Sequence, residues 1–137
     1  MSIELNHTII PAKDKWASAR FLAEILNREA GPEWGRFVPV KTDNGVTLDF
    51  ADATDFQPRH FAFLVSEAEF DTALARIRAQ DVKHYATPRR ERPGEINHRY
   101  GGRGVYFDDP DGHLMEIITR PYGPIPERWS PAGSNPA

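Results

Sequence analysis

The sequence predicts an α+β domain built from two similar β-α-β-β-β modules. Two observations carry this prediction. A strand, an amphipathic helix and further strands follow one another twice along the chain, and each round ends in a related turn and strand. The 137 residues suit one domain with a single packed core. We place this domain at residues 1–120, with module one at about 3–52 and module two at about 57–120. Residues 121–137, which are rich in proline, are predicted to form an irregular tail.

Module one begins with a predicted strand around His7 that ends near Pro11. Asp14 is a suitable N-cap for a helix from Lys15 to Asn27, in which apolar residues recur at helical spacing. The residues expected to face the sheet are Trp16, Ala19, Leu22, Ala23 and Leu26.

Two further strands complete module one. Residues 36–40 and 46–50 have β-forming patterns and are joined around Asp43-Asn44-Gly45, a typical hairpin turn. Alternation along the second strand turns its apolar residues toward the helix and Asp49 toward the opposite, concave side. Three roles stay open for Asp49: metal ligand, substrate contact or solvated residue.

Module two repeats this plan. A strand starts at His60, and Ser66 to Glu69 has the form of a capping box before a helix that ends near Ala79. A short strand is expected over 82–86. The inner face of the helix is predicted to carry Phe70, Leu74 and Ile77.

A hairpin closes module two. Its arms are predicted over 104–107 and 113–119, joined through Asp108-Asp109-Pro110-Asp111-Gly112. His113 directly follows this turn and is expected to be a surface or turn-stabilising residue.

The late segments of the two modules correspond in sequence. Residues 44–50 match residues 111–117 in turn position and strand phase. Asp49 is therefore the counterpart of Glu116, as His7 is the counterpart of His60. Internal repeats of this kind fix the architecture, here two modules around one site.

The composition argues against nucleic acid or an acidic membrane surface as a partner, because the formal net charge is −3. No stretch approaches the roughly 18 apolar residues that a membrane span needs. The chain has no cysteine, so any metal must be held by histidine and carboxylate side chains. The N-terminus enters a predicted strand without a basic or apolar leader, and we expect a cytoplasmic location.

His7, His60 and Glu116 each lie in a short apolar run predicted to be a strand. An ionisable side chain in such a run costs stability unless it has a partner. Two imidazoles and one carboxylate converging from three strands would hold a divalent metal as a facial triad and leave coordination positions open. Their near-equal spacing favours such a site over three unrelated structural residues.

Further candidates surround this triad. Residues 87–103 form a polar, basic loop that is expected to lie over the open side of the site. His98, Arg99 and Arg103 are its candidate substrate-binding residues, since arginine suits an anionic substrate group. A solvated basic loop is the alternative. Strand phase predicts that Tyr106 points into the cavity as a hydrogen-bond donor or proton carrier.

The segment from Gly104 to Glu116 resembles the vicinal oxygen chelate superfamily, which contains glyoxalase I, fosfomycin-resistance thiol transferases, bleomycin-binding proteins and extradiol dioxygenases. In that family an Asp-Pro-Asp-Gly turn precedes the strand with the carboxylate ligand, here Glu116. The first-strand histidines correspond to His7 and His60. The resemblance implies a half-barrel of paired modules around a divalent metal, and it implies a homodimer.

The resemblance is compatible with several functions. Glyoxalase-like proton transfer would use Zn²⁺, Ni²⁺, Mn²⁺ or Mg²⁺, whereas ring cleavage would use Fe²⁺ and O₂. Either enzyme would act on a small oxygen-rich molecule, with Asp49 or Glu116 as a base and Tyr106 as a further catalytic group. The family also includes non-catalytic binding or resistance proteins and thiol transferases for anionic antibiotics, and this chain could have either function. Retention of all three ligands argues against the bleomycin-binding branch.

Overall fold

The computed structural model describes residues 2–123, which form two compact units. Within this range the first unit takes in residues 2–58 with Asp109–Asp111, and the second takes in Arg59–Asp108 with residues 112–123. The predicted tail lies outside the described residues from position 124 onward. No helix in the described part of the chain is long and apolar enough to cross a membrane.

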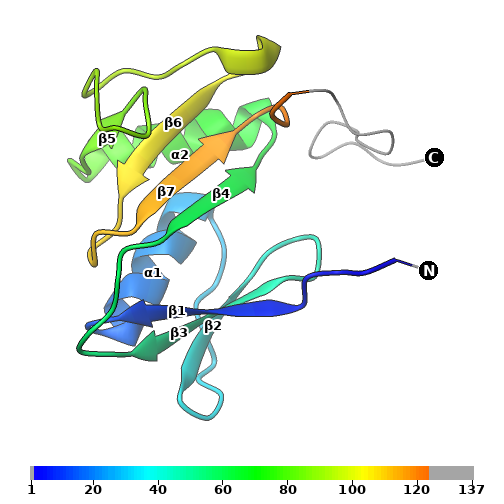
Figure 1. The fold of residues 1–137 in the computed structure, drawn as a ribbon, viewed down its shortest axis with the longest axis vertical. Helices are drawn as coiled ribbons and strands as arrows, with labels where there is room; N and C mark the ends of the chain where they lie inside the picture. Colours follow the sequence, from blue (N-terminus) through cyan, green and yellow to red (C-terminus); the bar gives the residue numbers. More distant parts are fainter. Residues whose placement is uncertain (1, 124–137) are drawn as a thin grey trace. The chain divides into compact units, whose positions relative to one another are not determined.

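The first unit is a three-stranded sheet with one helix packed on it (Figure 1). Its elements are β1 (His7–Ala12), α1 (Lys15–Leu26), β2 (Phe37–Lys41) and β3 (Thr47–Asp52). The strand order is β1-β3-β2, with β1 parallel and β2 antiparallel to β3. Helix α1 contacts all three strands and buries the core of this unit against them.

Helix α1 begins as predicted, because the Asp14 carboxylate accepts hydrogen bonds from the first free backbone N–H groups. It ends at Asn27, whose left-handed conformation closes the last turn. The buried face differs from the predicted one, because Ser18 and Ile25 are buried whereas Trp16 and Leu26 are only half-buried. A hydrogen bond accounts for this difference. The Ser18 hydroxyl donates to the Asp111 carboxylate, and this contact turns the Ser18 side of the helix inward.

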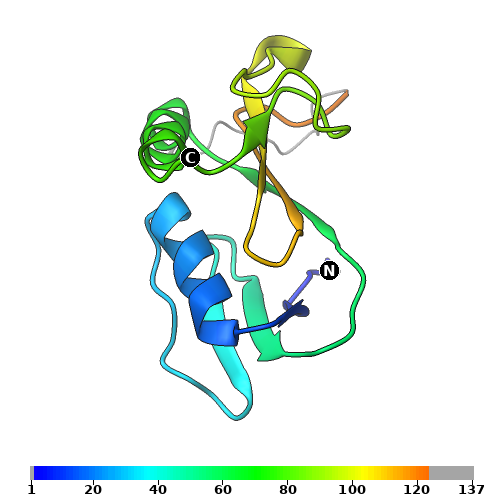
Figure 2. The same ribbon diagram turned by 90° about the vertical axis from the view of Figure 1, so that its left-hand side faces the viewer.

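The second unit is a four-stranded sheet covered on one face by α2 (Figures 1 and 2). In chain order it contains β4 (His60–Leu64), α2 (Glu67–Ala79), β5 (His84–Tyr85), a 3₁₀ turn (Arg99–Gly101), β6 (Gly104–Asp108) and β7 (Leu114–Ile118). The strand order is β4-β7-β6-β5. The predicted capping box is confirmed, since Ser66 and Glu69 each bond the other's backbone N–H. The core of the second unit holds Phe70, Ile77, Val105, Phe107, Met115 and Ile117.

The strand expected over 82–86 is limited to His84–Tyr85 in β5. Beyond it the backbone N–H of Ala86 already donates to the carbonyl of Glu91 across the following turn, which takes it out of the ladder. In the first unit the matching position is reduced to a single bridge between Ala30 and Val40. The predicted paired-module plan is confirmed, with this shorter fourth strand as the difference.

The two units share one strand register. In the first, β1 runs parallel to β3, with His7 opposite Thr47 and, two residues later, Ile9 opposite Asp49. In the second, β4 runs parallel to β7, and the residue two positions after His60 lies opposite Glu116. The fold therefore places a histidine and a carboxylate at equivalent positions of each sheet, as the repeat predicts.

Candidate functional site

His60 and Glu116 form a pair in the second unit. The His60 Nδ1 atom lies 2.8 Å from the backbone carbonyl of Leu114, and a carbonyl can only accept, so Nδ1 carries a proton. The other ring nitrogen, Nε2, lies 3.1 Å from Oε1 of Glu116. In the neutral imidazole this nitrogen presents a lone pair to a carboxylate oxygen. Two such acceptors face each other stably only with a cation between them, either a proton or a metal ion.

Glu116 is held in the middle strand β7 and is 1% exposed. Burial raises the pKa of this carboxyl above its usual value, while the hydrogen bond with Tyr106 and the charge of His60 offset part of the rise. A buried carboxyl of this kind gains from a bound proton or cation. Its position and partners fit the predicted role of metal ligand.

Tyr106 lies opposite Glu116 in the antiparallel register of β6 and β7, and its ring centroid is 5.9 Å from that of His60. Burial, and secondly the charge of Glu116, raises the pKa of Tyr106 to about 12. The phenol therefore keeps its proton at neutral pH. Of the two roles predicted for Tyr106, hydrogen-bond donor and proton carrier, this geometry favours the hydrogen-bond donor.

Sequence reasoning did not single out Tyr122, which belongs to this group. Its hydroxyl donates to Oε2 of Glu116 and lies 2.8 Å from the hydroxyl of Tyr106. The residue falls just past the last strand, where the sequence predicts only an irregular tail. The available signal is its position: it is an aromatic residue soon after the ligand strand, in a segment with few other apolar residues.

The loop before β6 brings Arg99 and Tyr100 to these tyrosines. Arg99 Nη1 lies 3.5 Å from the hydroxyl of Tyr106, and the rings of Tyr100 and Tyr122 have centroids 5.0 Å apart. Asn97 fastens the loop through paired backbone hydrogen bonds with Gly104. Among the three predicted substrate residues, Arg99 is the one that these contacts connect with the carboxylate group.

Arg103 has different contacts. Its guanidinium donates to Asp71 and Glu67, each at 2.8 Å, and lies 4.4 Å above the ring centroid of Phe70. These contacts, led by the hydrogen bond to Asp71, raise the pKa of Arg103 and anchor the loop to α2. His98 is exposed at the start of the 3₁₀ turn, and its side chain makes no capping hydrogen bond there.

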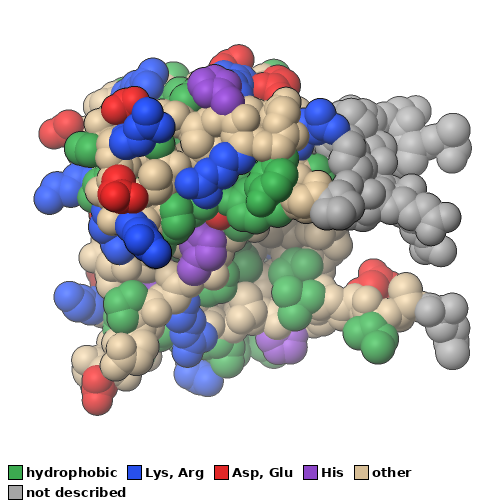
Figure 3. Space-filling model, turned by 45° about the horizontal axis from the view of Figure 1, so that its top comes forward, with side chains coloured by type: hydrophobic (Ala, Val, Ile, Leu, Met, Phe, Trp, Pro, Cys, Tyr) green, Lys and Arg blue, Asp and Glu red, His purple; other side chains and the backbone are tan. Residues whose placement is uncertain are grey.

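The basic character of the loop is partly balanced by neighbouring acids. Arg90 pairs with Asp108 at 2.8 Å, in addition to the contacts of Arg103. On the face shown in Figure 3, Lys and Arg side chains are interleaved with Asp and Glu rather than gathered into one cationic surface. The prediction of a solvated loop thus describes part of this segment, and Arg99 remains the cation directed at the tyrosines.

The first unit carries His7 and Asp49. His7 is exposed at the start of β1, and its Nδ1 atom lies 2.7 Å from the side-chain oxygen of Asn6. Asp49 is 7% exposed on the middle strand β3. Convergence of His7 with His60 and Glu116 on one metal stays a prediction, and so does the role of Asp49.

A second group of possible ligands lies in the turn between β6 and β7. One ligand atom from each of Asp109, Asp111 and His113 lies within 4.8 Å of the others. The Asp111 carboxylate, however, accepts from the backbone N–H of Lys13 at 2.9 Å and from the Ser18 hydroxyl. Asp109 accepts from the backbone N–H of Asp111 at 2.9 Å. These bonds give the turn a structural role.

His113 is fully buried, so its predicted surface position is wrong. Its Nδ1 atom accepts a hydrogen bond of 2.9 Å from the backbone N–H of Arg59, and its ring lies edge-on to Phe61. The second predicted role, a turn-stabilising residue, stays a prediction, because these contacts go to Arg59 and Phe61. The histidine ties the start of β4 to the turn that precedes β7.

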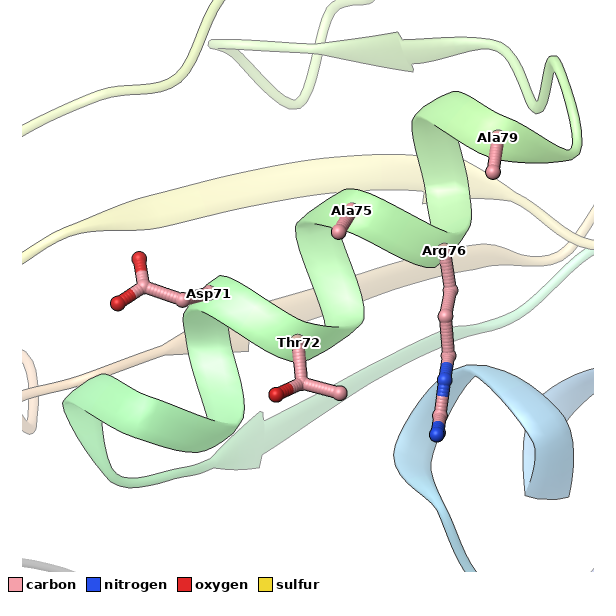
Figure 4. A pocket seen from close by; sticks show the side chains of 5 residues that line it. All are labelled: Asp71, Thr72, Ala75, Arg76 and Ala79. Carbon is pink, nitrogen blue, oxygen red and sulfur yellow. The ribbon is translucent and has the colours of Figure 1, made fainter.

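A hollow on the outer side of α2 does not involve these groups (Figure 4). It is lined by Asp71, Thr72, Ala75, Arg76 and Ala79. Its single carboxylate, Asp71, already pairs with Arg103. The hollow therefore lacks a set of ligands or reactive groups, and the cluster around Glu116 is the candidate site.

Comparison with known proteins shows the family to which the chain that carries this cluster belongs. The profile of the Glyoxalase/Bleomycin resistance protein/Dioxygenase superfamily matches residues 4–117. The chain belongs to this superfamily. This confirms both the resemblance and the predicted fold class.

Three relatives illustrate the superfamily. Oxidase ChaP-H2 is 56% identical, with 90% of this chain and 98% of that chain covered and a TM-score of 0.88. Glutathione transferase FosA of Serratia marcescens is 27% identical over 121 residues, which cover 82% of this chain and 78% of the relative. A FosX fosfomycin resistance protein of Listeria monocytogenes, solved with Mn(II), is 25% identical, with 89% of this chain and 96% of that chain covered and a TM-score of 0.68. The superfamily therefore includes metal-dependent members that act on small molecules.

Proposed function

We propose that this protein is an iron-dependent oxidase that acts on a small oxygen-rich molecule. The observation that carries the proposal is the 3.1 Å approach of His60 Nε2 to Glu116 Oε1, with Nδ1 of the same ring directed at the Leu114 carbonyl. The 56% identity with Oxidase ChaP-H2 supports the choice of oxidation over the other reactions of the superfamily. Among the metals that suit two imidazoles and a carboxylate, Fe²⁺ is the one suited to O₂ chemistry.

The donor set fits such a metal. A metal-binding histidine typically donates its other ring N–H to a carbonyl or carboxylate, as His60 does to Leu114. His7 has a similar arrangement, because the Asn6 side-chain oxygen can accept the Nδ1 proton and leave Nε2 available. We therefore assign His7, His60 and Glu116 as the ligands. When bound, Fe²⁺ would supply open positions for O₂ and for two neighbouring substrate oxygens.

The remaining residues have separate roles in this proposal. Tyr106 keeps its proton and donates a hydrogen bond, because its pKa is raised to about 12. Arg99, 3.5 Å from the Tyr106 hydroxyl, supplies positive charge for an anionic substrate oxygen. Asp49, the register equivalent of Glu116, is the proposed base that removes a substrate proton. His98 stays a candidate substrate contact, and Arg103 positions the loop.

The assembly belongs to the same proposal. His7 and Asp49 lie in one unit and His60 and Glu116 in the other, so one site needs both units, from one chain or from two. We propose a homodimer, the common state of small members of this family. A cytoplasmic location is the corresponding expectation.

A thiol transferase is the second candidate, favoured by the match to glutathione transferase FosA. It predicts turnover that requires an added thiol, whereas the oxidase predicts turnover that requires O₂. The contacts of Arg103 with Glu67 and Asp71 weaken the case for an anionic antibiotic, because they occupy one of the cations on which that case relies.

Elemental analysis of protein purified without added metal tests the proposal, together with His60→Ala. We expect near-stoichiometric iron in the wild type, its loss in the variant, and O₂ consumption with catechol-like substrates that stops when iron is removed. His84→Asn is the matched control, since the His84 side chain bonds the carbonyl of Val82 and asparagine keeps a donor there. Absence of metal uptake by the wild type would overturn the enzyme assignment and favour a binding protein.

A further inference from the structure

Tyr122 makes three contacts, one of which is with an oxygen of Glu116. Its hydroxyl donates to Oε2 of that carboxylate. The same hydroxyl lies 2.8 Å from the Tyr106 hydroxyl, and its ring packs on Tyr100 at 5.0 Å between centroids. Tyr122 is itself 44% exposed, so packing in the core does not account for its position.

Tyr122 belongs to a hydrogen-bonded network around Glu116. Tyr122 donates its one proton to the carboxylate, and Tyr106 hydrogen-bonds both Glu116 and the Tyr122 hydroxyl. The Tyr106 hydroxyl in turn accepts from Arg99 Nη1 at 3.5 Å. Arg99 and both tyrosines thus form one hydrogen-bonded network at the Glu116 carboxylate, in which Tyr122 is the residue that donates to Oε2.

The contacts of Glu116 make its two carboxylate oxygens different. Oε1 faces His60 Nε2 at 3.1 Å, whereas Oε2 is occupied by the Tyr122 hydroxyl. We propose that Tyr122 is a positioning residue that restricts Glu116 to one metal-bound oxygen and so keeps a coordination position free for a substrate oxygen. The inference rests on the proposed metal site and extends it to a residue outside the ligand set.

The loop holds Tyr122 in place through Tyr100. Tyr100 adopts a left-handed backbone conformation, with φ of 55° and ψ of 28°, which is uncommon for a non-glycine residue. The surroundings are fixed on both sides, by Asn97 bonded to Gly104 and by Arg103 bonded to α2. The ring of Tyr100 is therefore a supported surface for Tyr122.

Tyr122→Phe tests this inference, because it removes the hydroxyl and keeps the ring that packs on Tyr100. Tyr85→Phe is the matched control: Tyr85 also donates to a carboxylate, Asp108, at 2.9 Å, on the same sheet. Both variants and the wild type are loaded with Co²⁺. The readouts are the visible d–d absorption, which weakens as coordination number rises, and the affinity for 4-nitrocatechol, a chromophore with two adjacent oxygens.

We expect weaker d–d absorption in Tyr122→Phe than in the wild type, and an affinity for 4-nitrocatechol lower by about 10-fold, the size of effect that outer-shell changes produce. Tyr85→Phe should match the wild type in both. Equal spectra and equal affinities in all three proteins would overturn the positioning role while leaving the metal site intact. Failure of the wild type to bind Co²⁺ would overturn the proposed function and, with it, this inference.

Discussion

The two units present the same histidine and carboxylate positions in very different surroundings. In the second unit His60 is fixed between the Leu114 carbonyl and Glu116, and a buried carboxyl with a raised pKa lies beside it. In the first unit His7 is exposed and bonds its neighbour Asn6.

The difference shows that the shared strand register places a histidine and a carboxylate in each unit, whereas the neighbouring side chains determine what each pair can do. Glu116 is framed by two tyrosines from β6 and from the segment after β7. Asp49, its register equivalent, is one methylene shorter and lies on β3 in the smaller sheet. We therefore assign the two carboxylates different tasks, ligand for Glu116 and base for Asp49.

Replacement of Glu116, the carboxylate between the two tyrosines, should have the largest effect on metal binding. In Glu116→Gln we expect metal affinity to fall by more than about 100-fold, since loss of a ligand exceeds the effect of outer-shell changes. Titration with Fe²⁺ or Co²⁺ measures it. Retention of wild-type affinity would show that the second unit is not the principal binding half.

Asp49→Asn should separate the two tasks. Metal content should stay at the wild-type level, while kcat falls by about 100-fold or more because a general base is lost. Metal analysis and O₂ consumption are measured on the same sample. If the variant loses its metal instead, Asp49 is a fourth ligand and the two units are more alike than proposed.

The dependence of stability on pH should differ between metal-free and metal-loaded protein. The pKa of Glu116 is raised by burial, so without metal its contribution to stability is present below the ordinary glutamate pKa and lost as pH rises through the raised value. Metal binding needs the deprotonated carboxylate, so affinity should rise over the same window. Melting temperatures of the metal-free and metal-loaded protein are measured across this window. The difference between the two melting temperatures should widen as pH rises.

Glu116→Gln is the control for the pH experiment, because glutamine does not titrate. Its metal-free melting temperature should vary less with pH over that window. An unchanged pH dependence in this variant would assign the effect to another group.

A substitution in the loop of residues 87–103, which has no counterpart in the first unit, should have the smallest effect. Arg103→Ala should lower the free energy of unfolding by about 1 kcal/mol, as its acidic partners are largely exposed. It should raise KM more than it lowers kcat, since Arg99 and Tyr100 lose their anchor. Arg90→Ala is the control: it removes an ion pair with Asp108 instead and should leave KM unchanged.

Local signals in the sequence predicted much of this architecture. The capping box at Ser66, the hairpin turns and the matching of Asp49 with Glu116 all depend on residues close together in the chain or on strand alternation. Such patterns reflect local backbone chemistry, so they can be recognised without knowing the tertiary contacts. For the same reason they located Tyr106 on its strand.

The features that were missed depend on contacts between distant residues. Burial of Ser18 follows from its hydrogen bond to Asp111, and burial of His113 follows from its bond to Arg59. Tyr122 lies beyond the last strand, where periodicity carries no information, and its role is visible only through Glu116. Polar contacts of this kind leave no spacing signal in a single sequence.

The measurement that tests the central claim most directly is the anomalous scattering of crystals loaded with the metal. The proposal predicts one peak bound by His60 Nε2 and Glu116 Oε1, with His7 from the same chain or a partner chain as the third protein ligand. A peak at Asp109, Asp111 and His113 instead, or ligation without His60 and Glu116, would contradict it.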